Sequence, residues 1–552
     1  MSHSGAGRAL LADFGYATQD LTLGRVLARQ CARQPDKVFL TYLGDQRSYT
    51  YGDIERISNR LANGLLSLGI GRGAHVALIM ENSPEFIFLV LALGKIGAVS
   101  VPVNTAAKGR LLHYYLAQSD AAALLIDATL LERVQAIDPA GLKLRDLVVV
   151  GETDDGEASA AHGWRCWDYA RDLANADERN PGVEVQCSDL AFLSYTSGTT
   201  GPSKGNMLCH AAALGVGLSN AEHYGYRADD VVYTCLPLFH LNALQAATFG
   251  ALVSGASLVL SRRFSVSNYW REVRECRATI TNLLGSMLNF LWNQPPSPDD
   301  THNDLRMASC VPVPRFGREF ERRFGLSIIS NYALSDYGMV TAYTTADPPE
   351  KFGSAGKPRL NFEVRIVDEH DFELEDGRTG EIVARTTMPW RAASGYYNMP
   401  ERTLEAHRNL WFHTGDRGYF DADGYLYFVD RKKDAIRRRG ENISAFEVER
   451  IIEAHPAVAE SAVFPVRAEG GSEDEVAVAL ILKPDARATE TELVEYCRDN
   501  MAYFMVPRYV ELRAEFPRTL NQKIEKYQLR QAMEANLERA WDREKAGIAV
   551  RR

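Results

Sequence analysis

Helical and strand patterns alternate over about the first 350 residues of the chain. In residues 53–68 the apolar side chains recur every three or four positions, which places them on one face of a helix. Thr50, followed by Asp53, is typical of a helix N-terminus. Gly69 ends this pattern, and the apolar run at 75–80 (HVALIM) indicates a buried strand. Such alternation predicts an α/β fold with largely parallel sheets.

The pattern becomes shorter and more polar after about residue 360. Strand-like segments separated by Asp/Gly turns predict a small antiparallel barrel or sheet, and they lie at 362–367, 380–385 and 424–429. A compact α+β pattern follows, with a helix at 446–454 and strands at 458–466 and 475–483. Thr489 with Glu492 forms a capping box ahead of another helix. The last 25 residues are predicted to form a polar helix.

We therefore predict an α/β protein of two domains. The first, residues 1–432, is a large N-terminal domain of layered, mostly parallel sheets plus a small β-barrel, with subdomains at about 1–185, 186–360 and 361–432. The second, residues 433–552, is a small mobile α+β C-terminal domain. The charged stretch 430–443 (DRKKDAIRRRGENI) carries the predicted boundary.

Composition narrows the class of protein. Of the 552 residues, 46% are apolar and 24% charged, as in ordinary globular proteins, and the net charge of −10 argues against broad nucleic-acid binding. The longest apolar run, 86–94, is far shorter than the roughly 20 residues of a membrane span, and the N-terminus lacks the apolar core of a signal peptide. The eight cysteines include no C-x-x-C pair. We expect no membrane span, free thiols and a cytoplasmic protein.

A loop rich in hydroxyls and glycines follows the apolar strand 190–195. It reads Thr196-Ser197-Gly198-Thr199-Thr200-Gly201, with Lys204 close behind. Glycines let backbone N–H groups turn toward an anion, hydroxyls add donors, and the lysine adds a positive charge. The loop has the chemistry of a polyphosphate cradle, although composition alone fits a flexible surface loop equally well.

Three familiar motifs do not fit. The P-loop needs G-x-x-x-x-G-K-[ST], and Gly205 follows Lys204 here. Residues 201–205 match the G-x-S-x-G of serine hydrolases, but Ser203 lies across a long polar loop from the strand that should present it. Residues 69–74 match G-x-G-x-x-A, but they follow a helix and precede a strand, which favours a helix C-cap and turn.

The loop at 195–205 resembles the phosphate-loop signature of the adenylate-forming (AMP-binding) superfamily, which includes acyl-CoA synthetases, luciferases and peptide-synthetase adenylation domains. Segments similar to the superfamily's other motifs follow in order at 236–242 (LPLFHLN), 332–336 (YALSD), 380–382, 395–397, 411–416 (WFHTGD), 430–443 and 517–526. The match spans nearly the whole chain, and its overall texture is nearest to crotonobetaine/carnitine-type CoA ligases.

The resemblance implies an ATP-dependent acid–CoA ligase that uses ATP, Mg²⁺ and CoA. It implies that Lys523, Asp336 and Thr196 are catalytic and that Asp336 helps bind Mg²⁺. The implied ATP-binding residues are Thr196, Ser197, Gly198, Thr199, Thr200, Gly201, Lys204, Asn331, Tyr332, Ser335, Asp336, Asp416, Arg431 and Lys523. The physical need is clear, because a carboxylate and a triphosphate repel each other unless cations lie between them.

The same resemblance implies an acyl pocket, a CoA site and a hinge. The implied acyl-pocket residues are His240, Asn242, Gly285, Tyr337 and Gly338. Gly440 and Arg439 would meet CoA, and Lys433 would be the hinge at which the C-terminal domain rotates. The run 437–439 meets CoA phosphates or forms a solvated basic face, and the residues leave both open.

The expected partners are a small carboxylic acid, ATP and CoA, with no nucleic acid, and a homodimer is left open. Two alternatives stand beside the ligase. A stand-alone adenylating enzyme would load a separate carrier protein. A catalytically weak nucleotide- or acyl-binding relative is suggested by Ala333, Ser335, Asp336 and Gln522, which stand where the family usually has glycine, threonine, glutamate and glycine.

Overall fold

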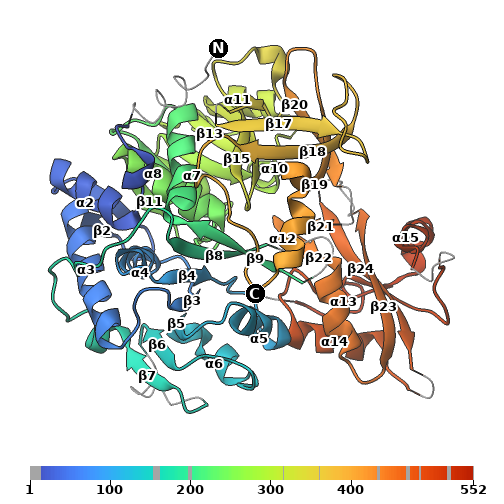
Figure 1. The fold of residues 1–552 in the computed structure, drawn as a ribbon. Coiled ribbons are helices and arrows are strands. Elements are labelled where there is room, and N and C mark those ends of the chain that lie inside the picture. Colours follow the sequence, from blue (N-terminus) through green and yellow to red (C-terminus); the bar gives the residue numbers. More distant parts are fainter. Residues whose placement is uncertain are drawn as a thin grey trace.

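The computed structural model describes nine stretches of the chain, which are 14–152, 162–196, 202–314, 316–359, 361–431, 435–467, 473–483, 486–518 and 524–550. Two large sheets with their helices occupy one side of the molecule, a small antiparallel sheet lies at the top of the view, and an α+β unit lies at the right (Figure 1). The predicted α/β class is therefore confirmed.

The first large sheet has seven strands and is parallel except for its last pair. In spatial order they are β7 (Arg165–Asp168), β6 (Asp146–Val150), β5 (Ala123–Asp127), β3 (His75–Ile79), β4 (Val99–Pro102), β8 (Leu190–Thr196) and β9 (Lys204–Cys209). The antiparallel pair β8–β9 flanks the predicted phosphate loop. Crossover helices between these strands are α4 (Pro84–Lys95), α5 (Gly109–Gln118) and α6 (Leu131–Gln135).

The second large sheet has nine strands, parallel in its centre and antiparallel at its ends. In spatial order they are β16 (Lys357–Pro358), β15 (Gly338–Tyr343), β14 (Ser327–Leu334), β13 (Met307–Val311), β12 (Ile280–Leu284), β10 (Val231–Thr234), β11 (Ser257–Leu260), β1 (Val38–Tyr42) and β2 (Arg47–Thr50). Its helices are α7 (His210–His223), α8 (Phe249–Ser254), α9 (Tyr269–Glu275), α10 (Gly285–Trp292) and α11 (Gly317–Phe324).

One large apolar core joins strands of both sheets to the helices packed between them. These include α2 (Leu23–Arg33), α3 (Tyr51–Ser67) and α4. The start of α3 follows the sequence prediction, because Thr50 accepts a hydrogen bond from the Asp53 N–H and Asp53 returns one to the Thr50 N–H. The turn at 69–74 caps this helix, with Gly69 and Gly73 at positive φ as the C-cap prediction requires.

The small β unit is a four-stranded antiparallel sheet made of β17 (Phe362–Val367), β18 (Gly380–Thr386), β19 (Phe412–Phe420) and β20 (Leu426–Arg431). Helix α12 (Pro400–Ala406) packs against β19. We call the described residues up to 431 the N-terminal unit and those from 435 onward the C-terminal unit.

The C-terminal unit starts with the hairpin β21 (Ala435–Arg438) and β22 (Glu441–Ser444). Its sheet contains β23 (Val458–Arg467), β24 (Asp474–Leu482), β25 (Tyr509–Leu512) and β26 (Trp541–Asp542). Its helices are α13 (Ala445–Glu453), α14 (Glu490–Asn500) and α15 (Lys526–Ala535). The predicted final helix is wrong in extent, because α15 ends at Ala535 and the chain returns as β26 to pair with β25.

The two units meet along α5 and the C-terminal helices (Figure 1). An apolar cluster runs from Leu111 and Leu112 on α5 to Val448 on α13 and Met501 after α14. At Gly109 a side chain would press on the Asn500 backbone, with its Cβ 3.1 Å from the Asn500 Cα. In the part of the chain that the structure describes, no helix combines the length and apolar character needed to cross a membrane.

Candidate functional site

A cavity of about 1480 Å³ lies between the two units. Residues just beyond the carboxyl ends of β3, β4, β10, β11, β12 and β14 line one side of it, as expected for ligand sites in parallel α/β sheets. Loops of the C-terminal unit line the other side. The sequence-predicted site residues that line it are Lys204, His240, Asn242, Ser335, Asp336, Asp416, Arg439 and Gly440.

Asp336 lies in the turn between β14 and β15, next to Tyr396 and within the electrostatic reach of Lys204. The turn is held by the Ala393 N–H, which donates to the Asp336 carbonyl at 2.7 Å. Burial raises the pKa of Asp336, while the Tyr396 hydroxyl and the Lys204 charge oppose the shift. Lys204 Nζ is 4.6 Å from the centre of the Tyr396 ring, so a cation and an acid flank one aromatic side chain.

Asp416 is almost fully buried and receives a hydrogen bond from the Tyr332 hydroxyl at 2.7 Å. Tyr332 comes from β14 and Asp416 from β19, so this bond joins the small sheet to the nine-stranded sheet. Register places Arg431 opposite Asp416 on the neighbouring strand β20. A carboxylate fixed at a cavity wall by a short hydrogen bond is well suited to accept hydrogen bonds from the hydroxyl groups of a sugar.

His240 and Asn242 follow β10 and line the cavity beside the C-terminal unit. The Asn282 side chain donates to Asn242 Oδ1 at 2.7 Å, which fixes the orientation of that amide. His240 Nε2 lies 3.0 Å from Glu441 Oε1, across the junction between the units. Burial lowers the pKa of His240, but the charge and hydrogen bond of Glu441 outweigh this and raise it overall.

Gly440 brings the hairpin β21–β22 against the N-terminal unit. It has φ +79°, and a Cβ added there would lie 2.6 Å from Leu284 Cδ1. The N–H of Gly440 donates to Glu473 Oε1 at 3.0 Å, and the Arg439 N–H donates to the other oxygen at 2.5 Å. These backbone bonds hold the turn at the cavity, and at Gly440 no side chain separates the turn from Leu284.

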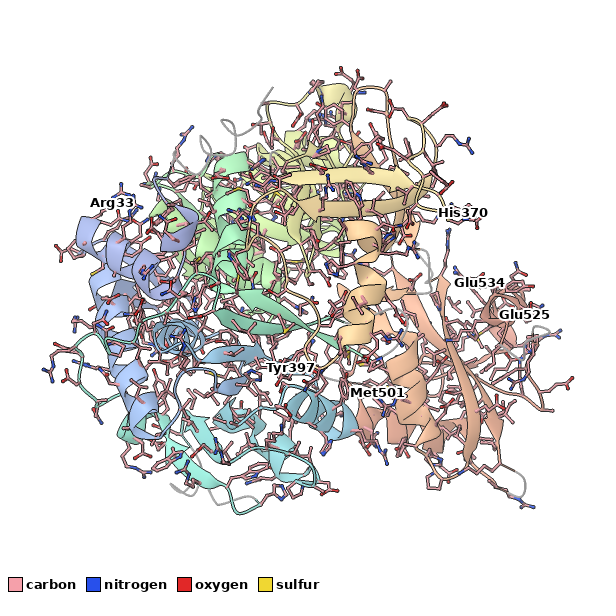
Figure 2. The ribbon with its side chains drawn as sticks, in the orientation of Figure 1. Arg33, His370, Tyr397, Met501, Glu525 and Glu534 are labelled. Carbon is pink, nitrogen blue, oxygen red and sulfur yellow. The ribbon has the colours of Figure 1, made fainter. Side chains whose placement is uncertain are left out.

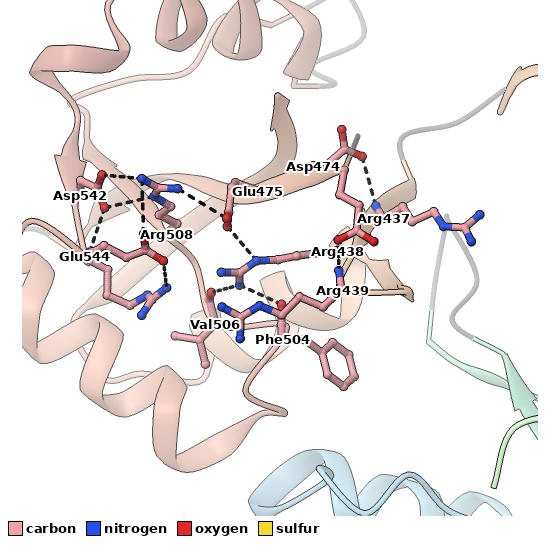
Figure 3. A network of polar contacts seen from close by, with 12 residues as sticks. Arg437, Arg438, Arg439, Asp474, Glu475, Phe504, Val506, Arg508, Asp542 and Glu544 are labelled. Atoms are coloured by element: carbon pink, nitrogen blue, oxygen red, sulfur yellow. Dashed lines mark hydrogen bonds and ion pairs between the residues drawn. The ribbon is translucent and has the colours of Figure 1, made fainter. Parts of the chain in front are cut away.

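The sequence left two roles open for the run 437–439, contact with CoA phosphates or a solvated basic face. Arg438 has neither role. Its side chain is buried within the C-terminal unit, 2.7 Å from Glu475 Oε2, and it donates to the carbonyls of Phe504 and Val506 at 3.1 Å each (Figure 3). Burial lowers the pKa of Arg438 to about 10. Arg438 therefore stabilises the loop internally, and of the three arginines it is Arg439 that lines the cavity.

Glu447 is a cavity residue that the sequence reasoning missed. It lies in the first turn of α13 and is 6% exposed, and its Oε1 accepts the Ser203 N–H at 2.6 Å across the junction. Burial raises the pKa of Glu447 to about 7. A glutamate in a first helical turn usually serves its own helix, so the pattern held no signal of a contact with the other unit.

Two family models match this chain. The family model described as AMP-binding enzyme matches residues 27–397, and the one described as AMP-binding enzyme C-terminal domain matches residues 447–523. The chain belongs to the AMP-binding enzyme family. It is an enzyme of the adenylate-forming acid–thiol ligase class, as the resemblance predicted.

One similar protein is the crotonobetaine/carnitine–CoA ligase of Salmonella typhimurium, 31% identical over 497 residues, with 89% of this chain and 95% of that protein covered. A double mutant of o-succinylbenzoate CoA synthetase from Bacillus subtilis, bound with its product analogue, has TM-score 0.78 and 26% identity, with 91% of this chain and 97% of that chain covered. ATP-bound MatB from Rhodopseudomonas palustris has TM-score 0.66 and 26% identity, with 93% and 99% covered.

Several predicted site residues of this AMP-binding enzyme lie away from the cavity wall. Asn331 donates to the Tyr224 hydroxyl at 2.8 Å, and Tyr332 donates to Asp416, which lines the cavity. Tyr337 stacks on Phe412 with ring centres 4.6 Å apart. A Cβ added at Gly338 would lie 3.0 Å from Val216 Cγ2, and one added at Gly285 would lie 2.7 Å from the Pro312 carbonyl oxygen. These last three residues therefore make packing contacts in the present pose and do not line the cavity.

Other predicted residues lie outside the described part of the chain, namely Ser197, Gly198, Thr199, Thr200, Gly201, Lys433 and Lys523. Thr196 ends β8 with its backbone paired to Lys204. Near the C-terminal lysine motif, Glu525 lies on the outer side of the C-terminal unit, whereas Met501 lies close to the junction (Figure 2).

The hydrolase alternative has no support at Ser203. The side chain is fully buried, and its hydroxyl lies 3.4 Å from the hydroxyl of Tyr115, a tyrosine where a nucleophile elbow would need a histidine base. Its carbonyl accepts the Tyr114 hydroxyl at 2.7 Å. Ser203 therefore anchors the end of the phosphate loop.

The residues present fit a magnesium ion that is bound largely through phosphates. Within the described stretches, no three His, Cys, Asp or Glu side chains form a group able to hold a metal by themselves. Asp336 supplies one carboxylate at the cavity wall. Mg²⁺ commonly uses one or two carboxylates, with nucleotide phosphates and waters completing its shell.

Proposed function

We propose that this AMP-binding enzyme is an ATP-dependent carboxylic acid–CoA ligase. The observation that carries the proposal is that one cavity joins Lys204, Asp336 and Asp416 of the N-terminal unit to the Gly440 loop of the C-terminal unit. The first group suits a nucleotide, and the second places the hairpin turn at the same cavity, against Leu284. The CoA ligases among its relatives support the same activity.

In the first half-reaction, an oxygen of the substrate carboxylate attacks the α-phosphorus of ATP. The bond to the pyrophosphate leaving group breaks, and an acyl-adenylate forms. Lys204 holds phosphate charge, Asp416 accepts the ribose hydroxyls, and Asp336 would hold Mg²⁺, which supplies charge neutralisation at the phosphates. Lys523, outside the described residues, is proposed to neutralise the approaching carboxylate and α-phosphate.

In the second half-reaction, the CoA thiol attacks the acyl carbonyl. A carbon–sulfur bond forms, the carbon–oxygen bond to AMP breaks, and the thiol proton is released to solvent. Gly440 and Arg439 line the cavity, and both are proposed to contact CoA there. His240 and Asn242 are proposed to border the acyl group at the same place.

The present arrangement of the units suits the second half-reaction. Gly440 faces the cavity, while Glu525 lies on the far side of the C-terminal unit (Figure 2). The TM-score of 0.78 with a product-analogue complex, against 0.66 with an ATP complex at equal identity, agrees with this. We propose a domain boundary at 432/433 and a rotation at Lys433 that brings Lys523 to the cavity for the first half-reaction.

The acid is proposed to be medium-sized and in part polar. Phe239, Leu284 and Met287 give the cavity apolar surface near His240 and Asn242. The eight free cysteines agree with the proposed cytoplasmic location. A homodimer stays an open prediction.

The test is a mixture of carboxylic acids, including carnitine, crotonobetaine, o-succinylbenzoate, malonate, anthranilate and fatty acids, incubated with ATP, Mg²⁺ and CoA. We expect one dominant acyl-CoA mass and acid-dependent pyrophosphate release. Pyrophosphate release without a thioester would favour a carrier protein, in place of CoA, as the acceptor of the acyl group. If neither product formed although each acid was tested singly at high concentration, the ligase proposal would be overturned.

A further inference from the structure

The contact between Glu447 and Ser203 joins the two units at the end of the phosphate loop. Ser203 directly precedes Lys204, and its side chain is fully buried. The loop end is fixed on the N-terminal side, because the Tyr114 hydroxyl donates to the Ser203 carbonyl at 2.7 Å and the Tyr115 hydroxyl lies 3.4 Å from the Ser203 hydroxyl. The Ser203 N–H therefore has a defined direction, and it donates to Glu447 at 2.6 Å.

A carboxylate at this place has consequences for a triphosphate. Glu447 and Lys204 line the same cavity. Glu447 occupies the Ser203 N–H, and a backbone N–H is a donor of the kind that anion sites offer to phosphates. The C-terminal unit thus occupies, at the wall of the proposed nucleotide site, a donor that a phosphate would otherwise use.

We propose that Glu447 is a positioning residue that holds the C-terminal unit in its present pose, and that this contact and bound ATP oppose each other. The proposal rests on the proposed function, because it assigns the triphosphate to this cavity. Departure of pyrophosphate after the first half-reaction frees the site, Glu447 then takes the Ser203 N–H, and the Gly440 loop is brought to the acyl-adenylate. The contact thereby orders the two half-reactions.

Because Glu447 titrates, the stability of this pose depends on pH. Tyr114 and Tyr115 face it from α5, Glu441 faces Tyr115 from β22, and Arg450 lies on its own helix. Burial raises the pKa of Glu447 to about 7 in this pose, above its ordinary value of 4.5. The pose therefore takes up a proton, so its stabilisation is full below the ordinary pKa and is lost as pH rises through about 7.

The first test measures Mg·ATP binding by calorimetry, with neither acid nor CoA present. Glu447→Ala should bind ATP on the order of 10-fold more tightly than the wild type, because ATP no longer competes with the hydrogen bond between Glu447 and the Ser203 N–H. Glu447→Gln should lie between the two. It should also lose the tightening that the wild type shows as pH rises through about 7, since the amide does not titrate.

The matched control is Glu449→Gln. Glu449 is on the same helix, but it pairs with Lys526 at 2.6 Å and accepts the Val463 N–H at 2.6 Å, both within the C-terminal unit. This variant should leave the affinity for ATP unchanged. If Glu447→Gln returns the affinity for ATP toward the wild-type value and Glu447→Ala does not, the effect comes from the contact and not from general damage to α13.

The second test is hydrogen exchange of the ligand-free enzyme at the peptide that carries the Ser203 N–H. Exchange there should be faster in Glu447→Ala and unchanged in Glu449→Gln. Equal ATP affinities and equal exchange in wild type and Glu447→Ala would overturn the proposal. If no variant bound ATP while exchange still responded to Glu447, the contact would stand and the proposed nucleotide site would fail.

Discussion

The two sides of the cavity are held in different ways. On the N-terminal side, Asp336 and Asp416 are fixed by Tyr396 and Tyr332, which belong to the same unit. On the C-terminal side, Gly440, Glu441 and Glu447 each contact the other unit. The first set therefore survives a rotation of the C-terminal unit, and the second exists only in this pose. Each side should accordingly affect a different half-reaction.

The largest effect is expected from Asp336→Asn. The carboxylate is the candidate magnesium ligand of the N-terminal side, and loss of one preorganised electrostatic group typically costs about 10²–10³ in rate. We expect that loss in acid-dependent exchange between ATP and pyrophosphate. Transfer from supplied acyl-adenylate to CoA should fall much less. Asp347→Asn is the control, because Asp347 binds Tyr425 and Thr344 at 2.8 Å. Unchanged exchange in Asp336→Asn would contradict the assignment.

Gly440→Ala should have the next largest effect, on the opposite half-reaction. Its Cβ would lie 2.6 Å from Leu284 Cδ1, so the hairpin must withdraw from the cavity. We expect acyl transfer to CoA to slow by about 10-fold, as a cost near 1–3 kcal/mol for overpacking implies. The exchange between ATP and pyrophosphate should stay within about 2-fold of wild type, well below that cost.

Gly547→Ala separates backbone strain from the steric contact at Gly440. Gly547 also has positive φ, +74°, and lies in the C-terminal unit, but nothing lies within 4 Å of its added Cβ. Both variants carry the cost of a side chain at positive φ, and only Gly440→Ala meets the other unit. Equal slowing of acyl transfer in both would show that the N-terminal unit plays no part.

Tyr332→Phe should have a moderate effect on the N-terminal side. It removes the 2.7 Å bond to the nearly buried Asp416, and loss of a partner for a buried acceptor costs about 1–3 kcal/mol. We expect a lower Tm and a several-fold higher KM for ATP, of the size that this cost allows. Tyr337→Phe is the control, because the stacking of Tyr337 on Phe412 needs only the ring. A normal KM for ATP in Tyr332→Phe would contradict the assignment of Asp416 to the ribose site.

The sequence predicted best what depends on neighbouring residues. The capping boxes at Thr50 and Thr489 both form, and strand β17 has the predicted bounds. Parallel sheets followed from the alternation of patterns, because helical crossovers join parallel strands. On the N-terminal side, Lys204 and Asp336 were named from their motifs and both line the cavity, while their roles stay predictions.

What depends on distant partners was not predicted. The tail turns back as β26 because β25 offers it an edge, and no local pattern records that pairing. Arg438 is buried by Glu475 on β24, although its sequence context is a run of charges. Tyr337 and Gly338 lie on the packed side of the turn after β14, while Ser335 and Asp336 reach the cavity. The contacts on the C-terminal side of the cavity could not be predicted for the same reason, because they join residues of two units.

The smallest effect is expected from Glu441→Gln, which alters the ion pair between Glu441 and His240 on the C-terminal side of the cavity. Pairs that are partly exposed contribute about 0–1 kcal/mol, so acyl transfer at neutral pH should change by no more than about 5-fold. The amide keeps a hydrogen bond but removes the charge that raises the pKa of His240. In the wild type, the pair stabilises the pose fully below the ordinary pKa of His240, 6.5, and this is lost as pH rises through the raised pKa.

The pH profile of acyl transfer is therefore the sharper readout for this pair. In Glu441→Gln the limb that reports His240 should shift to lower pH, while the profile of exchange between ATP and pyrophosphate stays in place. Glu453→Gln is the control, since Glu453 accepts the Ser461 N–H at 3.0 Å within the C-terminal unit. If the exchange profile moved together with the transfer profile, His240 would act in both half-reactions, and the division between the two sides of the cavity would not hold there.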